Sequence, residues 1–110
     1  MSGVLPMIDD PSCAPLVDVV RPNALQLVRL KAIADETRLT LLLTLLHAGK
    51  AVCVCNLLPG AGVGQATVSH HLKVLREAGL VAVERRGIWA HYSICPAVRS
   101  WLTALLANSS

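Results

Sequence analysis

Residues 65–94 read QATVSHHLKVLREAGLVAVERRGIWAHYSI, and this stretch decides the fold class. Its first half repeats apolar residues at helical spacing, and Gly79 is a typical helix stop. Its second half, residues 80–94, is β-branched and aromatic around the polar tip ERRG at 84–87, which is typical of a hairpin. We therefore expect a helix over 65–78 that is followed directly by a β-hairpin.

Two helices are predicted upstream of this stretch. Asn23 and Gln26 resemble a capping pair that opens the first helix. Asp35 is a good cap for the second helix, which Gly49 stops. Leucine occurs on nearly every side of the second helix, so we expect this helix to be buried all round.

A short third helix should start close to Cys53. We expect Pro59 to end or bend it early, because proline lacks an N–H donor and clashes with the preceding turn. The run GAGVG at 60–64 is a turn, and a final helix follows Pro96. Residues 1–20 contain three prolines and little periodicity, so we interpret them as an irregular arm ahead of one domain over 21–110.

A short helix, a glycine-containing turn and a second helix form a helix-turn-helix, whose second helix enters the major groove of DNA. The outer face of the 65–78 helix presents hydrogen-bonding side chains, and the hairpin tip carries arginines suited to phosphates or the minor groove. These candidate DNA contacts are Thr67, Ser69, His70, Lys73, Arg85 and Arg86. Each feature alone is common on a solvated surface. Their order predicts a mainly α winged helix-turn-helix protein.

Composition fits a DNA-binding dimer. The chain of 110 residues is 54% hydrophobic and only 15% charged, and a small monomer hides that much apolar content poorly, so we expect a homodimer. The formal charge is +3 overall, but the arm is acidic and the remainder is basic, as a polyanion partner requires.

No secretory signal or membrane-spanning run is visible, which indicates a cytoplasmic location. No phosphate loop, acid pair or nucleophile triad indicates an enzyme.

Cys53 and Cys55 stand one residue apart in AVCVCNLL, residues 51–58, in a chain with four cysteines. In a reducing cytosol they are metal ligands, redox sensors or core residues. Residues two apart on a regular helix point to nearly opposite sides, so one ion takes both thiolates only in an unwound segment or the entering turn, and we expect binding to distort the helix. The positive helix N-terminus should favour the thiolate, and soft sulfur selects thiophilic ions.

The runs DETRLTLLLTLL, CVCNLL and residues 65–94 together resemble the ArsR/SmtB family of metal-responsive repressors over roughly residues 25–95. The resemblance implies that 65–78, including Gln65, is the recognition helix and that 80–94 is the wing. It also implies that the first and last helices form the dimer. Gly64 stands where many members have a serine cap, and glycine also caps tolerably.

The resemblance further implies that Cys53 and Cys55 form the metal box. Arsenic sensors supply a third cysteine three residues after the second, where this chain has Leu58. Cadmium and lead sensors complete the site with an N-terminal arm, which favours Cys13 as the third ligand and leaves Cys95 as the alternative. Zinc and nickel sensors often use Asp, His and Glu on the last helix, and residues 96–110 contain none of these.

We therefore expect a homodimeric repressor that binds an inverted-repeat operator and is released by As(III) or Sb(III), with Cd(II) or Pb(II) as the alternative inducers. Two other readings stay open: oxidant sensing through the same thiols, and a thiol metal carrier or oxidoreductase that never touches DNA. Of the other histidines, His71 should flank the core, and His47 and His91 should be structural or exposed.

Overall fold

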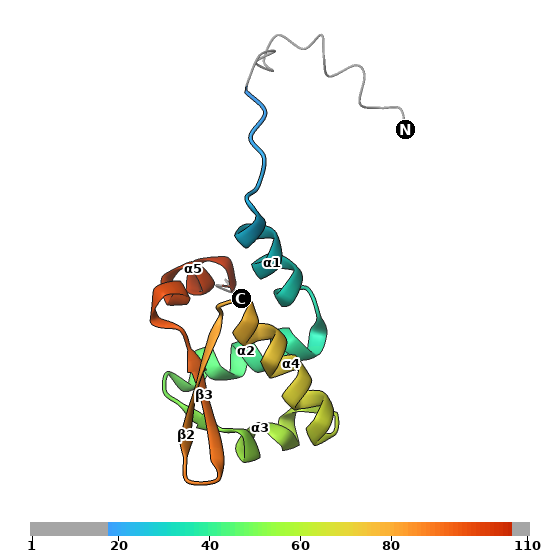
Figure 1. Cartoon of the computed structure of the whole chain (residues 1–110), viewed down its shortest axis with the longest axis vertical. Coiled ribbons are helices and arrows are strands. Elements are labelled where there is room, and N and C mark those ends of the chain that lie inside the picture. Colours follow the sequence, from blue (N-terminus) through green and yellow to red (C-terminus); the bar gives the residue numbers. More distant parts are fainter. Residues whose placement is uncertain (1–17, 107–110) are drawn as a thin grey trace.

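The computed structural model describes residues 18–106, apart from the side chains of residues 58–61. Its elements are, in order, α1 (Ala24–Ile33), α2 (Glu36–Ala48), β1 (Val52–Cys53), α3 (Val54–Ala61), α4 (Gln65–Glu77), β2 (Val81–Arg86), β3 (Trp89–Ile94) and α5 (Pro96–Leu106). This order confirms the predicted winged helix-turn-helix (Figure 1). In the described part of the chain, no helix is long and apolar enough to cross a membrane. Of the arm expected over 1–20, only residues 18–20 are described, and Cys13 lies outside the described residues.

The helix boundaries follow from local chemistry. Asn23 and Gln26 form the predicted capping box at the start of α1. Asp35 accepts a hydrogen bond from the backbone N–H of Arg38 at the start of α2, and Gly49 ends α2 in the left-handed conformation. At the end of α4, the Leu80 N–H donates to the Leu75 carbonyl at 3.0 Å, as the predicted glycine stop requires.

Pro59, which we expect to end or bend the third helix early, lies two residues before the end of α3. The helix continues to Ala61 and stops before Gly62, which has a φ of 73°. Proline's own φ is compatible with a helix, so the missing N–H removes one hydrogen bond without stopping the chain. The left-handed glycine ends this helix.

The sheet has three strands in the order β1-β3-β2, and all neighbours are antiparallel. Arg86 pairs with Trp89, which leaves Gly87 and Ile88 as the turn, and Gly87 has the positive φ of 65° that such a turn needs. The sequence did not predict β1, because two residues are too few to show an alternating pattern. Cys53 ends this strand and is also the N-cap of α3, which confirms that the third helix starts close to Cys53.

The core lies between α2, α4, the sheet and α5. Its fully buried leucines are Leu41, Leu42, Leu45, Leu72, Leu75, Leu80 and Leu102. The expectation that α2 is buried all round is wrong, because Leu43 is 43% exposed and Leu39 and Leu46 are only partly buried. One side of α2 therefore remains open to solvent.

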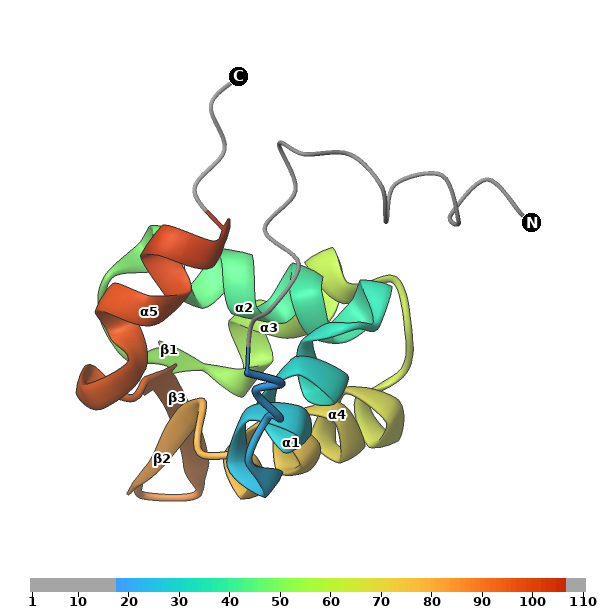
Figure 2. The ribbon, with the colours of Figure 1, turned by 90° about the horizontal axis from the view of Figure 1, so that it is seen from above.

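The recognisable elements lie toward two opposite ends of the molecule. Figure 1 shows α1 and α5 at one end, and α3 with the tip of the hairpin at the other. Seen from above, α2 runs across the middle, with α5 on one side and α1 and α4 on the other (Figure 2). Arg29 on α1 lies 5.8 Å from the ring centre of Trp101 on α5, which links these two helices by a cation–π contact.

Candidate functional site

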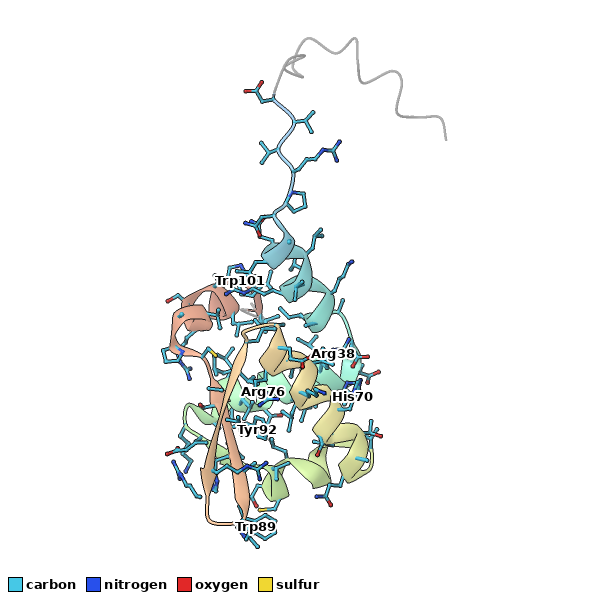
Figure 3. The ribbon with its side chains drawn as sticks, viewed as in Figure 1. Arg38, His70, Arg76, Trp89, Tyr92 and Trp101 are labelled. Atoms are coloured by element: carbon cyan, nitrogen blue, oxygen red, sulfur yellow. The ribbon has the colours of Figure 1, made fainter. Side chains whose placement is uncertain are left out.

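A groove of about 400 Å³ opens between α4 and the hairpin. Three cations line it, Lys73, Arg76 and Arg85, and no acidic side chain does. Figure 3 shows Arg76 and Tyr92 between α4 and the hairpin, and Trp89 at the hairpin tip. A concave surface with one sign of charge attracts a polyanion.

The groove contains some of the predicted DNA contacts and excludes others. Gln65, Ser69, Lys73 and Arg85 line it. Thr67, His70 and Arg86 are exposed, as expected, but lie outside the lining. The guanidinium of Arg86 instead contacts the Glu84 carboxylate at 3.0 Å.

Several lining residues had no DNA-binding role assigned from the sequence, among them Arg76, Ile88 and Trp89. Arg76 could have been found, because it continues the Gln65, Ser69 and Lys73 stripe at a spacing of three or four residues. Ile88 and Trp89 are 83% and 49% exposed at the hairpin tip. In the sequence such residues look like ordinary strand formers, so only the structure, which places Ile88 in the turn and Trp89 at the start of β3, identifies them as part of the groove.

A polar cluster fixes α4 against the start of α2. The Arg38 Nε donates to the Ala32 carbonyl at 2.7 Å, and its Nη1 lies 3.1 Å from the His71 Nδ1 on α4. The Asp35 carboxylate accepts from the Arg38 N–H at 3.0 Å and lies 4.0 Å from the His71 Nδ1. Because arginine only donates, His71 Nδ1 serves as the acceptor in this contact. We call Asp35, Arg38 and His71 the α2 latch.

The α2 latch predicts a pH-dependent stability. The backbone N–H of Arg38 is the main cause that holds the pKa of Asp35 below its usual value, followed among the lowering causes by the charge of Arg38. A lowered folded-state pKa stabilises the fold above the unfolded pKa of about 3.9, and this stabilisation is lost as the pH falls through the folded pKa. Asparagine caps equally well but does not titrate, so Asp35→Asn is a matched variant.

Wild-type protein should therefore be more stable than Asp35→Asn at pH 7, and the difference should shrink as the pH falls below about 4. Urea unfolding followed by circular dichroism at both pH values measures this difference. A difference that stays constant from pH 7 to pH 3 would contradict the assigned role of the carboxylate.

The two thiols converge at the junction of β1 and α3. Cys53, the last residue of β1, is the N-cap of α3 with an extended backbone (φ −61°, ψ 139°), and Cys55 lies in the first turn. Their Sγ atoms are 2.6 Å apart, and both cysteines are free. Cys53 is 9% exposed, whereas Cys55 is open to solvent. The two sulfurs therefore meet in the entering turn, one of the two arrangements that allow a single ion to take both.

The neighbouring thiol reverses the expected effect of the helix N-terminus on Cys55. Contact with Cys53 is the main cause that raises the pKa of the Cys55 thiol, and desolvation adds to it. The backbone N–H groups of Cys55 and Asn56 lower the pKa, as expected at a helix start, but they do not prevail. An ion that binds here must therefore displace a proton.

The pair offers two soft donors and needs at least one more. Within residues 18–106, no three His, Cys, Asp or Glu side chains form a ready-made ion site. Cys95 is half-buried and packs against the core. Two adjacent free thiols, one of them exposed, suit a thiophilic ion better than a hard cation.

The apolar side chains of the first two turns of α1 are largely uncovered. Leu25, Leu27, Val28 and Leu30 are 42% to 51% exposed, and Leu105 on α5 is 47% exposed. We call these five residues the α1 face. Aliphatic side chains clustered in this way mark an interaction surface.

Comparison with known proteins identifies close relatives. The family model described as bacterial regulatory protein, arsR family, matches residues 35–83. The arsenical resistance operon repressor of Escherichia coli (strain K12) is 38% identical over 76 residues, which cover 69% of this chain and 64% of the relative. The cadmium resistance transcriptional regulatory protein CadC homolog of Staphylococcus aureus is 30% identical over 78 residues, covering 70% of this chain and 64% of that protein.

A solved structure shares the fold. The homodimeric winged helix-turn-helix DNA-binding domain of a possible ArsR-family transcriptional regulator from Mycobacterium bovis superposes with a TM-score of 0.66 and 28% identity. The match covers 76% of this chain and 75% of that one. The chain spans less than two thirds of the length of both sequence relatives.

Proposed function

Because this chain belongs to the arsR family of bacterial regulatory proteins, we propose that it is a repressor that binds an inverted-repeat operator as a homodimer and is released by As(III) or Sb(III). The family consists of regulators and not of enzymes. One observation carries the proposal. The Cys53 and Cys55 sulfurs meet 2.6 Å apart at the start of α3, the helix that precedes the recognition helix α4.

The groove beside α4 supports DNA binding. Its three cations suit phosphates, and Gln65 and Ser69 near the N-terminus of α4 present hydrogen-bonding groups where base contacts are usually made. Thr67 and His70 lie on the exposed surface of α4, outside the protein groove. They would contact bases only if α4 lies along the major groove of the DNA.

The geometry of the thiols suggests how an ion acts. With metal–sulfur bonds of about 2.3 Å, two sulfurs on one ion stand roughly 3.3 to 3.8 Å apart. The Sγ atoms lie closer together than this, so the two side chains rotate apart when they take one ion. One sulfur belongs to β1 and the other to α3, so an ion bound to both ties the wing sheet to the helix-turn-helix.

For the third sulfur we retain Cys13 in the N-terminal arm, reaching either its own site or that of the other subunit. Cys95 is the weaker candidate, because its packing against the core must be broken before it binds an ion. Three sulfurs suit trivalent arsenic.

Cadmium or lead is the second candidate inducer. The cadmium resistance regulator similar to this chain supports it, and soft divalent ions also select thiolates. Oxidant sensing by the same pair is distinguished by titrating free thiols after peroxide treatment in the absence of metal.

The experiment that tests the proposal is an operator titration. Fluorescence anisotropy of a labelled inverted repeat gives the affinity with and without arsenite, and again with and without Cd(II). Arsenite should weaken binding. Tight binding that neither ion changes would remove the inducer part of the proposal, and no binding to any candidate operator would remove the repressor part.

The homodimer is proposed to form through the α1 face. Leu27→Ala should weaken the dimer roughly 30-fold, because each of the two subunits loses on the order of 1 kcal/mol of apolar burial, about 2 kcal/mol in total. Leu43→Ala is the matched control: Leu43 is 43% exposed and Leu27 is 42% exposed, but Leu43 lies on α2. Sedimentation velocity at a series of concentrations measures both. Equal dimer constants for the two variants would place the interface elsewhere.

A further inference from the structure

The ring of His91 holds a buried nitrogen with no partner. His91 lies in the middle of β3 and is partly buried, and its Nδ1 is inaccessible without making a hydrogen bond. The only other side-chain atom of this kind in the described part of the chain is the Arg29 Nε. A buried polar atom without a partner costs free energy, and such atoms in folded proteins call for an explanation.

The strand register places His91 beside the thiols. His91 is the direct cross-strand partner of Cys53, so the two side chains share one face of the sheet with Cβ atoms about 4.5 to 5.5 Å apart. Cys55 reaches the same place, because its Sγ lies 2.6 Å from that of Cys53. On the other side, His91 pairs with Glu84, whose carboxylate is occupied by Arg86.

We propose that His91 is the nitrogen ligand of a mixed site, in which Cys53, Cys55 and His91 bind a divalent thiophilic ion such as Cd(II). This inference rests on the proposed ion-binding role of the cysteine pair. Thiolates and imidazoles together bind divalent ions in tetrahedral sites, whereas As(III) binds through sulfur ligands alone. The three side chains do not form a ready-made site, so the His91 ring must turn toward the sulfurs when the ion enters.

The ligands of this site come from three elements. Cys53 ends β1, Cys55 lies in α3, and His91 lies in β3, one strand of the wing. An ion held by all three ties the wing to the first helix of the helix-turn-helix. The angle between the wing and α4, which determines the shape of the DNA-binding groove, then depends on ion occupancy.

The test is a titration of the full chain under reducing conditions with Cd(II), followed by thiolate charge-transfer absorbance. His91→Ala should bind Cd(II) more than about tenfold more weakly than wild type, since even outer-shell partners of a metal contribute about 10- to 100-fold in affinity. His47→Ala, which removes an exposed histidine on α2, should bind normally. Arsenite affinity should be the same in wild type and His91→Ala.

A direct readout is the ring-nitrogen NMR shift of His91, which should move on addition of Cd(II) and stay unchanged on addition of arsenite. His91→Cys provides a gain of function that does not depend on the stability of the alanine variant: a third sulfur at this position should tighten arsenite binding. Unchanged Cd(II) affinity in His91→Ala, or no gain in His91→Cys, overturns the role of His91. Unchanged Cd(II) affinity in Cys55→Ser would instead remove the cysteine pair and with it the proposed function.

Discussion

Saturating arsenite should lower the operator affinity of the wild-type protein by about fivefold to 150-fold, the usual range of coupling between two sites, and should leave the affinity of Cys55→Ser unchanged. Cys55 is the reachable member of the pair, because it is exposed while Cys53 is 9% exposed at the end of β1. Serine keeps the shape and polarity of the side chain but replaces the soft donor with a hard one. The substitution therefore removes the ion and retains the fold.

The control for this prediction is Cys95→Ser, which changes a free cysteine that packs against the core, away from the pair. This variant should be released by arsenite like the wild type, with affinity measured by anisotropy on the same labelled operator. Cys13→Ser then reports on the arm: weaker release identifies Cys13 as the third ligand. Equal release of wild type and Cys55→Ser by arsenite would mean that the ion acts somewhere other than the cysteine pair.

The sequence predicted the helices and the hairpin because their causes are local. Helix caps and stops make contacts only with residues a few positions away in the chain. The structure confirms each helix boundary predicted from Asn23 with Gln26, from Asp35 and from Gly79. The exact end of α3 was harder to predict. The helix stops at Ala61, two residues after Pro59, where Gly62 takes the left-handed conformation.

The candidate site was predicted less completely, because it depends on pairings between distant residues. The strand β1 exists only through its partner β3, so the sequence offered no pattern for it, and the position of Cys53 at a strand end was missed. The contact between Arg38 and His71 joins residues 33 positions apart, and the pairing of Cys53 with His91 spans a similar distance. The sequence predicted which residues of α4 are exposed more easily than which of them line the groove. The helical pattern shows the exposed face of α4, but it does not show which side of that face lies next to the wing.

The wing arginines should contribute unequally to DNA binding. Arg85 lines the groove, whereas Arg86 lies outside its lining and its guanidinium is held 3.0 Å from the Glu84 carboxylate. A free cation that neutralises one phosphate adds about 0.9 to the slope of log affinity against log salt, and a cation already paired with a carboxylate adds less. Arg85→Ala should therefore reduce the salt slope by about 0.9 and weaken operator binding roughly tenfold. Arg86→Ala should change both quantities less.

Lys50→Ala is the matched control for the wing, because Lys50 is an exposed cation in the loop between α2 and β1 and does not line the groove. Operator titrations from about 50 to 200 mM salt yield the slope for each variant. The double variant Arg85→Ala with Arg86→Ala should show the sum of the two single effects, unless Glu84, freed from Arg86, repels the DNA and makes the loss larger. If Arg85→Ala and Lys50→Ala have the same slope as the wild type, the groove between α4 and the wing does not contact phosphate, and DNA must bind to another surface of the dimer.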